Sequence, residues 1–135
     1  MVDAQQESDM KIAAFHDPVY NFTLHLLWEI DAKQLGEYVA TNFPGEENVD
    51  EADDWWGCHL PFTQRADPPH EVHVVALREM SLAPEPLAVL THELFHVTHD
   101  VLRGRGIKCK DSTVEAYTYL LDSLVRRCLE EFVKS

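Results

Sequence analysis

Apolar and polar residues alternate along three short stretches of the chain, and this pattern predicts strands. From Phe22 to Ile30 apolar residues occupy every second position, and only Leu27 interrupts the alternation. The segment from Trp55 to Phe62 is largely apolar, and Glu71 to Glu79 is rich in β-branched residues. We therefore expect three strands, the second of which ends at Pro61.

Three longer stretches repeat their apolar residues with the period of a helix. The first opens with Asp and Gln three positions apart, which is the spacing of a capping box. The second has two prolines in its first turn and two glycines after its end, and the third follows a Ser-Thr pair and carries one apolar face. The predicted helices run from Asp31 to about Thr41, from Pro84 to about Arg103, and from Ser112 or Thr113 to about Val133.

The order of these elements is strand, helix, strand, strand, helix, helix, which indicates an α+β fold. We expect one domain over residues 1–135, in which a small sheet packs against an antiparallel pair of C-terminal helices. Residues 1–10 are expected to form a polar, solvated tail. Residues 46–54 are expected to form an acidic, solvated loop, with a surface for metal ions or a basic partner as the alternative.

The charge balance narrows the possible partners. The chain has 24 acidic and 11 basic residues and a formal net charge of −13, which argues against binding to nucleic acid or an anionic membrane. No apolar run approaches the roughly 20 residues that span a bilayer, and the polar N-terminus does not resemble a secretory signal. Three cysteines are an odd number without paired spacing, so we expect no disulfide framework and a location in the cytoplasm.

The second predicted helix contains the sequence H-E-L-F-H, from His92 to His96. Residues four apart lie one above the other on a helix, so His92 and His96 present two imidazoles to one point. This geometry is typical of a zinc site, and Glu93 beside it is the usual general base of metal-assisted hydrolysis. The motif therefore predicts Zn²⁺ bound by His92 and His96.

A catalytic zinc site needs a third protein ligand, and Glu115, His99 and Asp111 are the candidates. We favour Glu115, because the loop between the two helices is long enough to bring it level with His96. The alternative is that Glu115 completes a capping box with Ser112. His99 would reach too far along the same helix for one ion, and a role facing the substrate suits it better.

Other polar residues are weaker candidates. Tyr119 and Asp122 follow Glu115 on the same helical face and could orient an imidazole or contact substrate. His25 is expected to be a half-exposed strand residue rather than a ligand. His73 is expected to face solvent or the core with equal chance, and a role as a ligand or beside the substrate is the weaker alternative.

The C-terminal sixty residues or so carry a family resemblance. T-H-E-L-F-H-V-T-H-D followed by V-E-A-Y-T-Y-L-L-D resembles the zincin metallopeptidases, in the gluzincin-type branch with a glutamate as third ligand. It also looks like small peptidase-like proteins encoded by tailed bacteriophages. The resemblance implies a minimal zincin-like core with zinc at His92, His96 and Glu115. The second helix lacks the N-E-x-x-x-D form of the larger gluzincins.

Together these observations predict a zinc-dependent metallohydrolase, of the small phage metallopeptidase type, that cleaves a peptide or protein. Glu93 would act as general base, Tyr119 or His99 would stabilise the oxyanion, and the strand from Glu71 to Glu79 would pair with an extended substrate at a sheet edge. The alternative is a non-catalytic phage structural or morphogenesis protein that zinc stabilises, in the host cytoplasm or the virion. A metal-free helical hairpin is a third, weaker interpretation.

Overall fold

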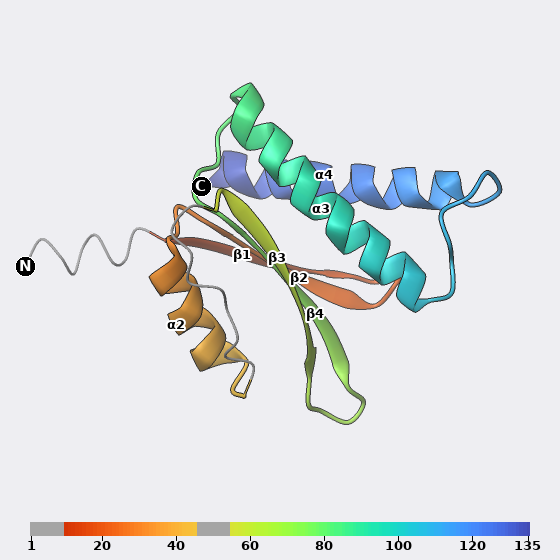
Figure 1. The fold of residues 1–135 in the computed structure, drawn as a ribbon, viewed down its shortest axis with the longest axis horizontal. Helices are drawn as coiled ribbons and strands as arrows, with labels where there is room; N and C mark the ends of the chain where they lie inside the picture. The colour runs from red at the N-terminus through yellow and green to blue at the C-terminus, as the bar shows by residue number, and fades with distance from the viewer. Residues whose placement is uncertain (1–9, 46–54) are drawn as a thin grey trace, which may run out of the picture.

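A computed structural model describes residues 10–45 and 55–135 of the chain (Figure 1). The expected polar tail, apart from Met10, and the expected acidic loop at 46–54 lie outside the described residues. Four strands and three helices form within the described part, and their mixed arrangement confirms the α+β class. The elements are β1 (Lys11–Asp17), β2 (Phe22–Trp28), α2 (Ala32–Asn42), β3 (Gly57–Gln64), β4 (His70–Leu77), α3 (Pro84–Gly104) and α4 (Val114–Lys134).

The four strands form one mixed sheet in the order β1-β2-β4-β3. β1 pairs antiparallel with β2, β3 pairs antiparallel with β4, and the central pair of β2 and β4 is parallel. The prediction that the strand from Glu71 to Glu79 receives a peptide at a sheet edge is therefore wrong. That strand is β4, and because β2 and β3 flank it, its backbone groups are already paired on both sides.

Helices cover both faces of this sheet, so the described part of the chain has three layers (Figure 1). On one face α3 and α4 pack over β2 and β4, and α4 returns across α3 in roughly the opposite direction. On the other face α2 packs against the remaining side chains of the same two strands. This second covered face explains why Leu27 interrupts the alternation in β2, because it is fully buried beneath α2.

The observed strands differ from the predicted ones at two places. β1 is absent from the prediction, because on its core side only Ala13 and Phe15 are apolar and its other positions carry little signal. β3 does not end at Pro61 but continues to Gln64. Proline is tolerated there because β3 is an edge strand, where a missing N–H need not break the pairing.

The helices agree closely with their sequence signals. Asp31 caps α2 through a complete capping box, in which its side chain accepts a hydrogen bond from the Gln34 backbone and its own backbone donates to the Gln34 side chain. α3 begins at Pro84, and α4 begins after Thr113. Within residues 10–45 and 55–135, no helix combines the length and apolarity needed to cross a membrane.

His25 lies on the α2 side of the sheet and is half-buried, as the alternation in β2 predicts. Its Nδ1 atom is 2.7 Å from the Tyr38 hydroxyl oxygen, and its ring packs beside Phe43. Burial lowers the pKa of His25, and the nearby His70 adds to the effect. The neutral imidazole is therefore part of the packing between the sheet and α2.

We expect acid to destabilise the wild-type protein more than the His25→Gln variant. Because folding lowers the pKa of His25, its contribution to stability is present above the ordinary histidine pKa of 6.5 and is lost as the pH falls toward the folded-state value. Urea unfolding at about pH 7 and about pH 5 measures the free energy of unfolding of both proteins. An equal loss in both would contradict this prediction.

Candidate metal centre

The apolar packing of α3 determines where its polar side chains point. Leu90, Leu94, Val97 and Val101 are fully buried against the sheet and α4. His92 and His96 therefore lie on the opposite, exposed side of the helix. Glu93 lies between these two sides and is buried, with 8% of its surface exposed. The helix thus presents two accessible imidazoles and one shielded carboxylate.

The predicted pair of histidines converges. The Nε2 atoms of His92 and His96 are 3.2 Å apart, and Glu93 Oε2 is 3.9 Å from His92 Nε2. Two ligands on a tetrahedral zinc ion, each bonded at about 2.0–2.1 Å, are about 3.3 Å apart. The two imidazoles are therefore already spaced as zinc ligands, and the donor atoms of all three residues lie within 4.8 Å of one another.

Glu93 is held in an environment that favours its protonated form. Burial raises the pKa of its carboxyl group, and this effect outweighs the opposing influence of His92 and His96. A carboxylate of this kind accepts a proton more readily than a surface glutamate does. On its buried side Glu93 approaches β3, where its Cγ atom would lie 3.3 Å from a Cβ added to Gly57.

The structure does not bring the other predicted site residues into this group. Glu115 is exposed in the first turn of α4, and it does not form the alternative capping box, because the N-cap Thr113 makes no side-chain bond to the helix. Asp111 is exposed in the preceding loop, and Tyr119 is 69% exposed on α4. His99 is half-buried, with its ring between Phe95 and Tyr117.

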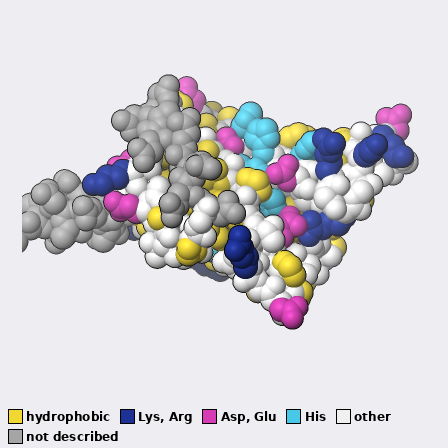
Figure 2. Space-filling model, turned by 60° about the horizontal axis from the view of Figure 1, so that its bottom comes forward, with side chains coloured by type: hydrophobic (Ala, Val, Ile, Leu, Met, Phe, Trp, Pro, Cys, Tyr) yellow, Lys and Arg dark blue, Asp and Glu magenta, His cyan; other side chains and the backbone are white. Residues whose placement is uncertain are grey.

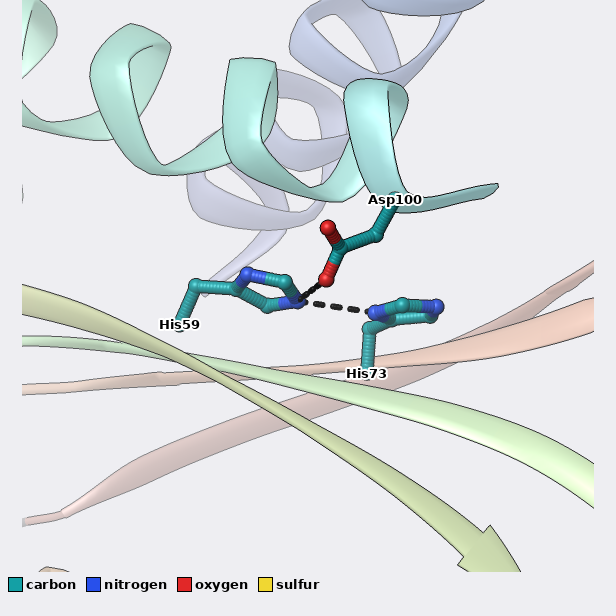
Figure 3. A group of neighbouring side chains, drawn as sticks. All are labelled: His59, His73 and Asp100. Atoms are coloured by element: carbon teal, nitrogen blue, oxygen red, sulfur yellow. Dashed lines mark hydrogen bonds and ion pairs between the residues drawn. The ribbon is translucent and has the colours of Figure 1, made fainter. Parts of the chain in front are cut away.

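A second group of metal-binding side chains lies beside the first and comes from three elements (Figure 3). His59 of β3 is opposite Val75, and Pro61 is opposite His73 of β4, so both histidines lie on the face that α3 covers. His59 Nε2 is 2.8 Å from His73 Nδ1 and 3.9 Å from Asp100 Oδ2 of α3.

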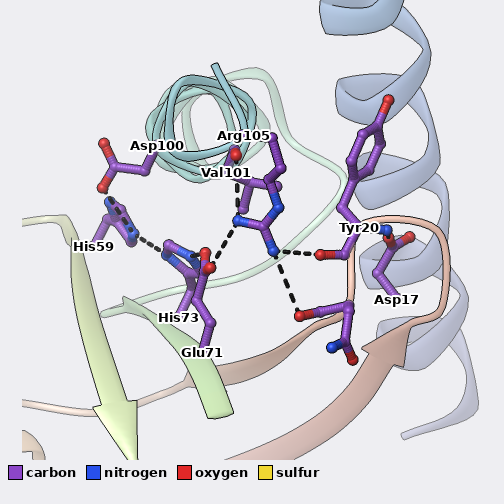
Figure 4. Close-up of polar contacts among 9 residues, drawn as sticks. Asp17, Tyr20, His59, Glu71, His73, Asp100, Val101 and Arg105 are labelled. Carbon is purple, nitrogen blue, oxygen red and sulfur yellow. Dashed lines mark hydrogen bonds and ion pairs between the residues drawn. The ribbon is translucent and has the colours of Figure 1, made fainter. Parts of the chain in front are cut away.

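His73 is held in place by a chain of charged groups (Figure 4). Its Nε2 atom is 2.5 Å from Glu71 Oε2, and Arg105 Nη1 donates to Glu71 Oε1 at 2.7 Å. Burial opposes ionisation of Glu71, but the hydrogen bonds from His73 and Arg105 outweigh it and lower its pKa. Arg105 also donates to the backbone oxygens of Tyr20 and Val101, so this chain connects the β1–β2 turn to α3 and β4.

His59 is neutral near pH 7. Burial lowers its pKa, His73 and His96 lower it further, Asp100 opposes them, and the resulting value is about 4. A neutral imidazole is the form of histidine that binds metals.

The two groups are neighbours. The rings of His59 and His96 are nearly parallel, with centroids 6.4 Å apart. Figure 2 shows histidine side chains reaching one face of the molecule with acidic side chains beside them. Next to His92 and His96 is a largely apolar surface hollow of about 680 Å³, whose lining includes Leu87, Phe95 and Leu121.

Sequence reasoning missed the second group for a specific reason. The alternation in β4 places His73 on the same face as Val75 and Leu77, which are buried. This pattern in the sequence indicates that His73 faces the core. The structure shows His73 buried at 2% exposure, which corrects the expectation of a side chain that could equally face solvent. His59 carries no comparable signal, because its position depends on the register between β3 and β4.

The chain was compared with protein-family models, with curated proteins and with solved structures, and none of them matches it.

We expect Gly57→Ala to destabilise the protein by about 1–3 kcal/mol, because a Cβ at this position would lie 2.7 Å from Val89 Cγ1 and 3.0 Å from Leu77 Cδ2. Thermal and urea unfolding measure the change. The matched control is Gly36→Ala in α2, where nothing lies within 4 Å of the added Cβ and a gain of about 0.5–1 kcal/mol is expected. Equal stability of the Gly57→Ala variant and the wild type would contradict the prediction.

Proposed function

We propose that this protein is a zinc-dependent hydrolase that cleaves an amide bond in a peptide or protein. His92 and His96 would bind the metal, and Glu93 would act as the general base. The observation that carries the proposal is the 3.2 Å separation of the two Nε2 atoms with a shielded carboxylate beside them. Two imidazoles and an acidic residue form a donor set that suits zinc better than magnesium or calcium.

Glu115 remains the proposed third ligand, although in this structure its carboxylate lies outside the His92–Glu93–His96 group and would have to move to reach the ion. Among the described residues, no hydrogen bond or ion pair engages its carboxylate, so the group is free to take part in binding an ion. It also lies on α4, which packs against α3. His99 and Asp111 are the other candidates. Asp111 is exposed, as Glu115 is, whereas His99 is half-buried and its ring lies near those of Phe95 and Tyr117.

Bound zinc would supply a water molecule of lowered pKa and would polarise the scissile carbonyl group. The residues of the chain account for the proton transfers. Glu93 would accept the proton of the attacking water, a step that its raised pKa favours, and would then deliver this proton to the leaving amine. His99 and Tyr119 are proposed to donate to the developing oxyanion.

The apolar hollow beside the histidine pair supports a substrate with an apolar side chain. Within residues 10–45 and 55–135, β3 is an edge strand of the sheet, and it carries His59. It therefore replaces β4 as the proposed site for pairing with an extended peptide. All three cysteines are free, which supports action in a reducing compartment such as the cytoplasm of a bacterial host.

We expect His96→Ala and Glu115→Ala each to hold one zinc ion per chain fewer than the wild type, and Glu93→Gln to hold as much zinc as the wild type. Elemental analysis measures the metal, and mass spectrometry of a mixed peptide library measures cleavage. Because Glu93 moves the proton without holding the metal, Glu93→Gln should lower kcat by at least about 10²-fold.

His16→Ala is the matched control, because His16 is an exposed histidine on β1 outside both donor groups, and it should keep both zinc and activity. Zinc in Glu115→Ala would show that another residue is the third ligand. A wild type that holds zinc in these ligands without cleaving any peptide would favour a non-catalytic zinc-stabilised protein of a phage particle or its assembly. Absence of zinc from the wild type would overturn the proposal.

A further inference from the structure

We propose that His59, His73 and Asp100 form a second binding site for a divalent cation of the zinc class, next to the His92–His96 pair. The three residues come from β3, β4 and α3, and their donor atoms lie within 4.8 Å of one another. This site is separate from the one proposed for hydrolysis, and the inference does not require that the protein be an enzyme.

The orientation of His73 favours metal binding. Its Nε2 atom faces the Glu71 carboxylate, which can only accept a hydrogen bond, so Nε2 carries the ring proton. Nδ1 therefore carries a lone pair, which in this structure accepts a hydrogen bond from His59 Nε2 at 2.8 Å. A bound cation would replace that proton between the two rings. A carboxylate behind the distal nitrogen of a histidine is the usual support for a metal ligand. Arg105 fixes that carboxylate in turn (Figure 4).

The spacing of the donors also fits a cation. Ligands on a tetrahedral zinc ion are about 3.3 Å apart, and the two distances from His59 Nε2, 2.8 Å to His73 Nδ1 and 3.9 Å to Asp100 Oδ2, lie on either side of that value. Without a cation, only His59 and His73 are hydrogen-bonded to each other, because 3.9 Å is too long for a hydrogen bond from His59 to the Asp100 carboxylate. A cation would use all three.

The site is sheltered but accessible. His73 is 2% exposed, and the side chain of His59 is 7% exposed, whereas the side chain of Asp100 is 46% exposed. A hollow of about 450 Å³ is lined by Glu71, His73 and Asp100 together with residues of β3. This hollow provides an entry path for an ion and room for a water molecule as the fourth ligand.

The test is a titration of the full-length protein with Co²⁺ after treatment with a chelator, followed by desalting and elemental analysis. We expect the wild type to bind two cobalt ions per chain, and His59→Gln and Asp100→Ala each to bind the second ion at least about 10-fold more weakly. His92→Ala should lose only the other ion. Glu130→Ala, which removes an exposed carboxylate of α4 outside both groups, is the matched control and should bind two ions.

The variants separate this inference from the proposed hydrolase. One ion that survives His59→Gln and Asp100→Ala but is lost in His92→Ala would overturn the second site and leave the proposed function standing. One ion that is lost in His59→Gln and Asp100→Ala but survives His92→Ala would support the second site and overturn the proposed function. Thermal unfolding of each variant without metal checks that the chain folds. If His59→Gln does not fold, Asp100→Ala still tests the site, because Asp100 lies on the exposed side of α3 and its replacement should not disturb the core.

Discussion

The packing of α3 onto the sheet is the constraint on which the polar architecture depends. Four fully buried aliphatic residues fix the rotation of this helix about its axis: Leu90, Leu94, Val97 and Val101. A different rotation would bury the histidine pair or remove Glu93 from β3. Because core side chains are close-packed, such a rotation is strongly opposed. The same packing places Asp100 and Arg105, at the end of α3, over the strands that carry His59 and Glu71.

Local signals in the sequence predicted the helices and the convergence of His92 and His96, but not the positions of the other proposed site residues. The capping box at Asp31, the proline at the start of α3 and the spacing of His92 and His96 all depend on neighbours within four residues. The features that were missed depend on distant pairings. β1 is recognisable only by its register with β2, and His59 reaches His73 only through the register of β3 with β4. The position of Glu115 relative to His96 depends likewise on how two helices cross.

The two donor groups differ in how firmly they are held. His92 and His96 stand on one helix with exposed side chains and no carboxylate behind their rings among the described contacts, whereas His73 is enclosed and supported by Glu71 and Arg105. Preorganised donors lose less side-chain freedom when an ion binds. The net charge of −13 also favours the approach of cations to both groups.

The strand order has a consequence for how the chain assembles. β1 and β2 form one hairpin, β3 and β4 form another, and the parallel contact between β2 and β4 is the seam that joins them. During synthesis β3 has no pairing partner until β4 has emerged. The hairpin of β3 and β4 therefore pairs with β2 late, and until then one edge of β2 is unpaired. A partial opening along this seam would expose two strand edges at once, and such edges invite association with another chain.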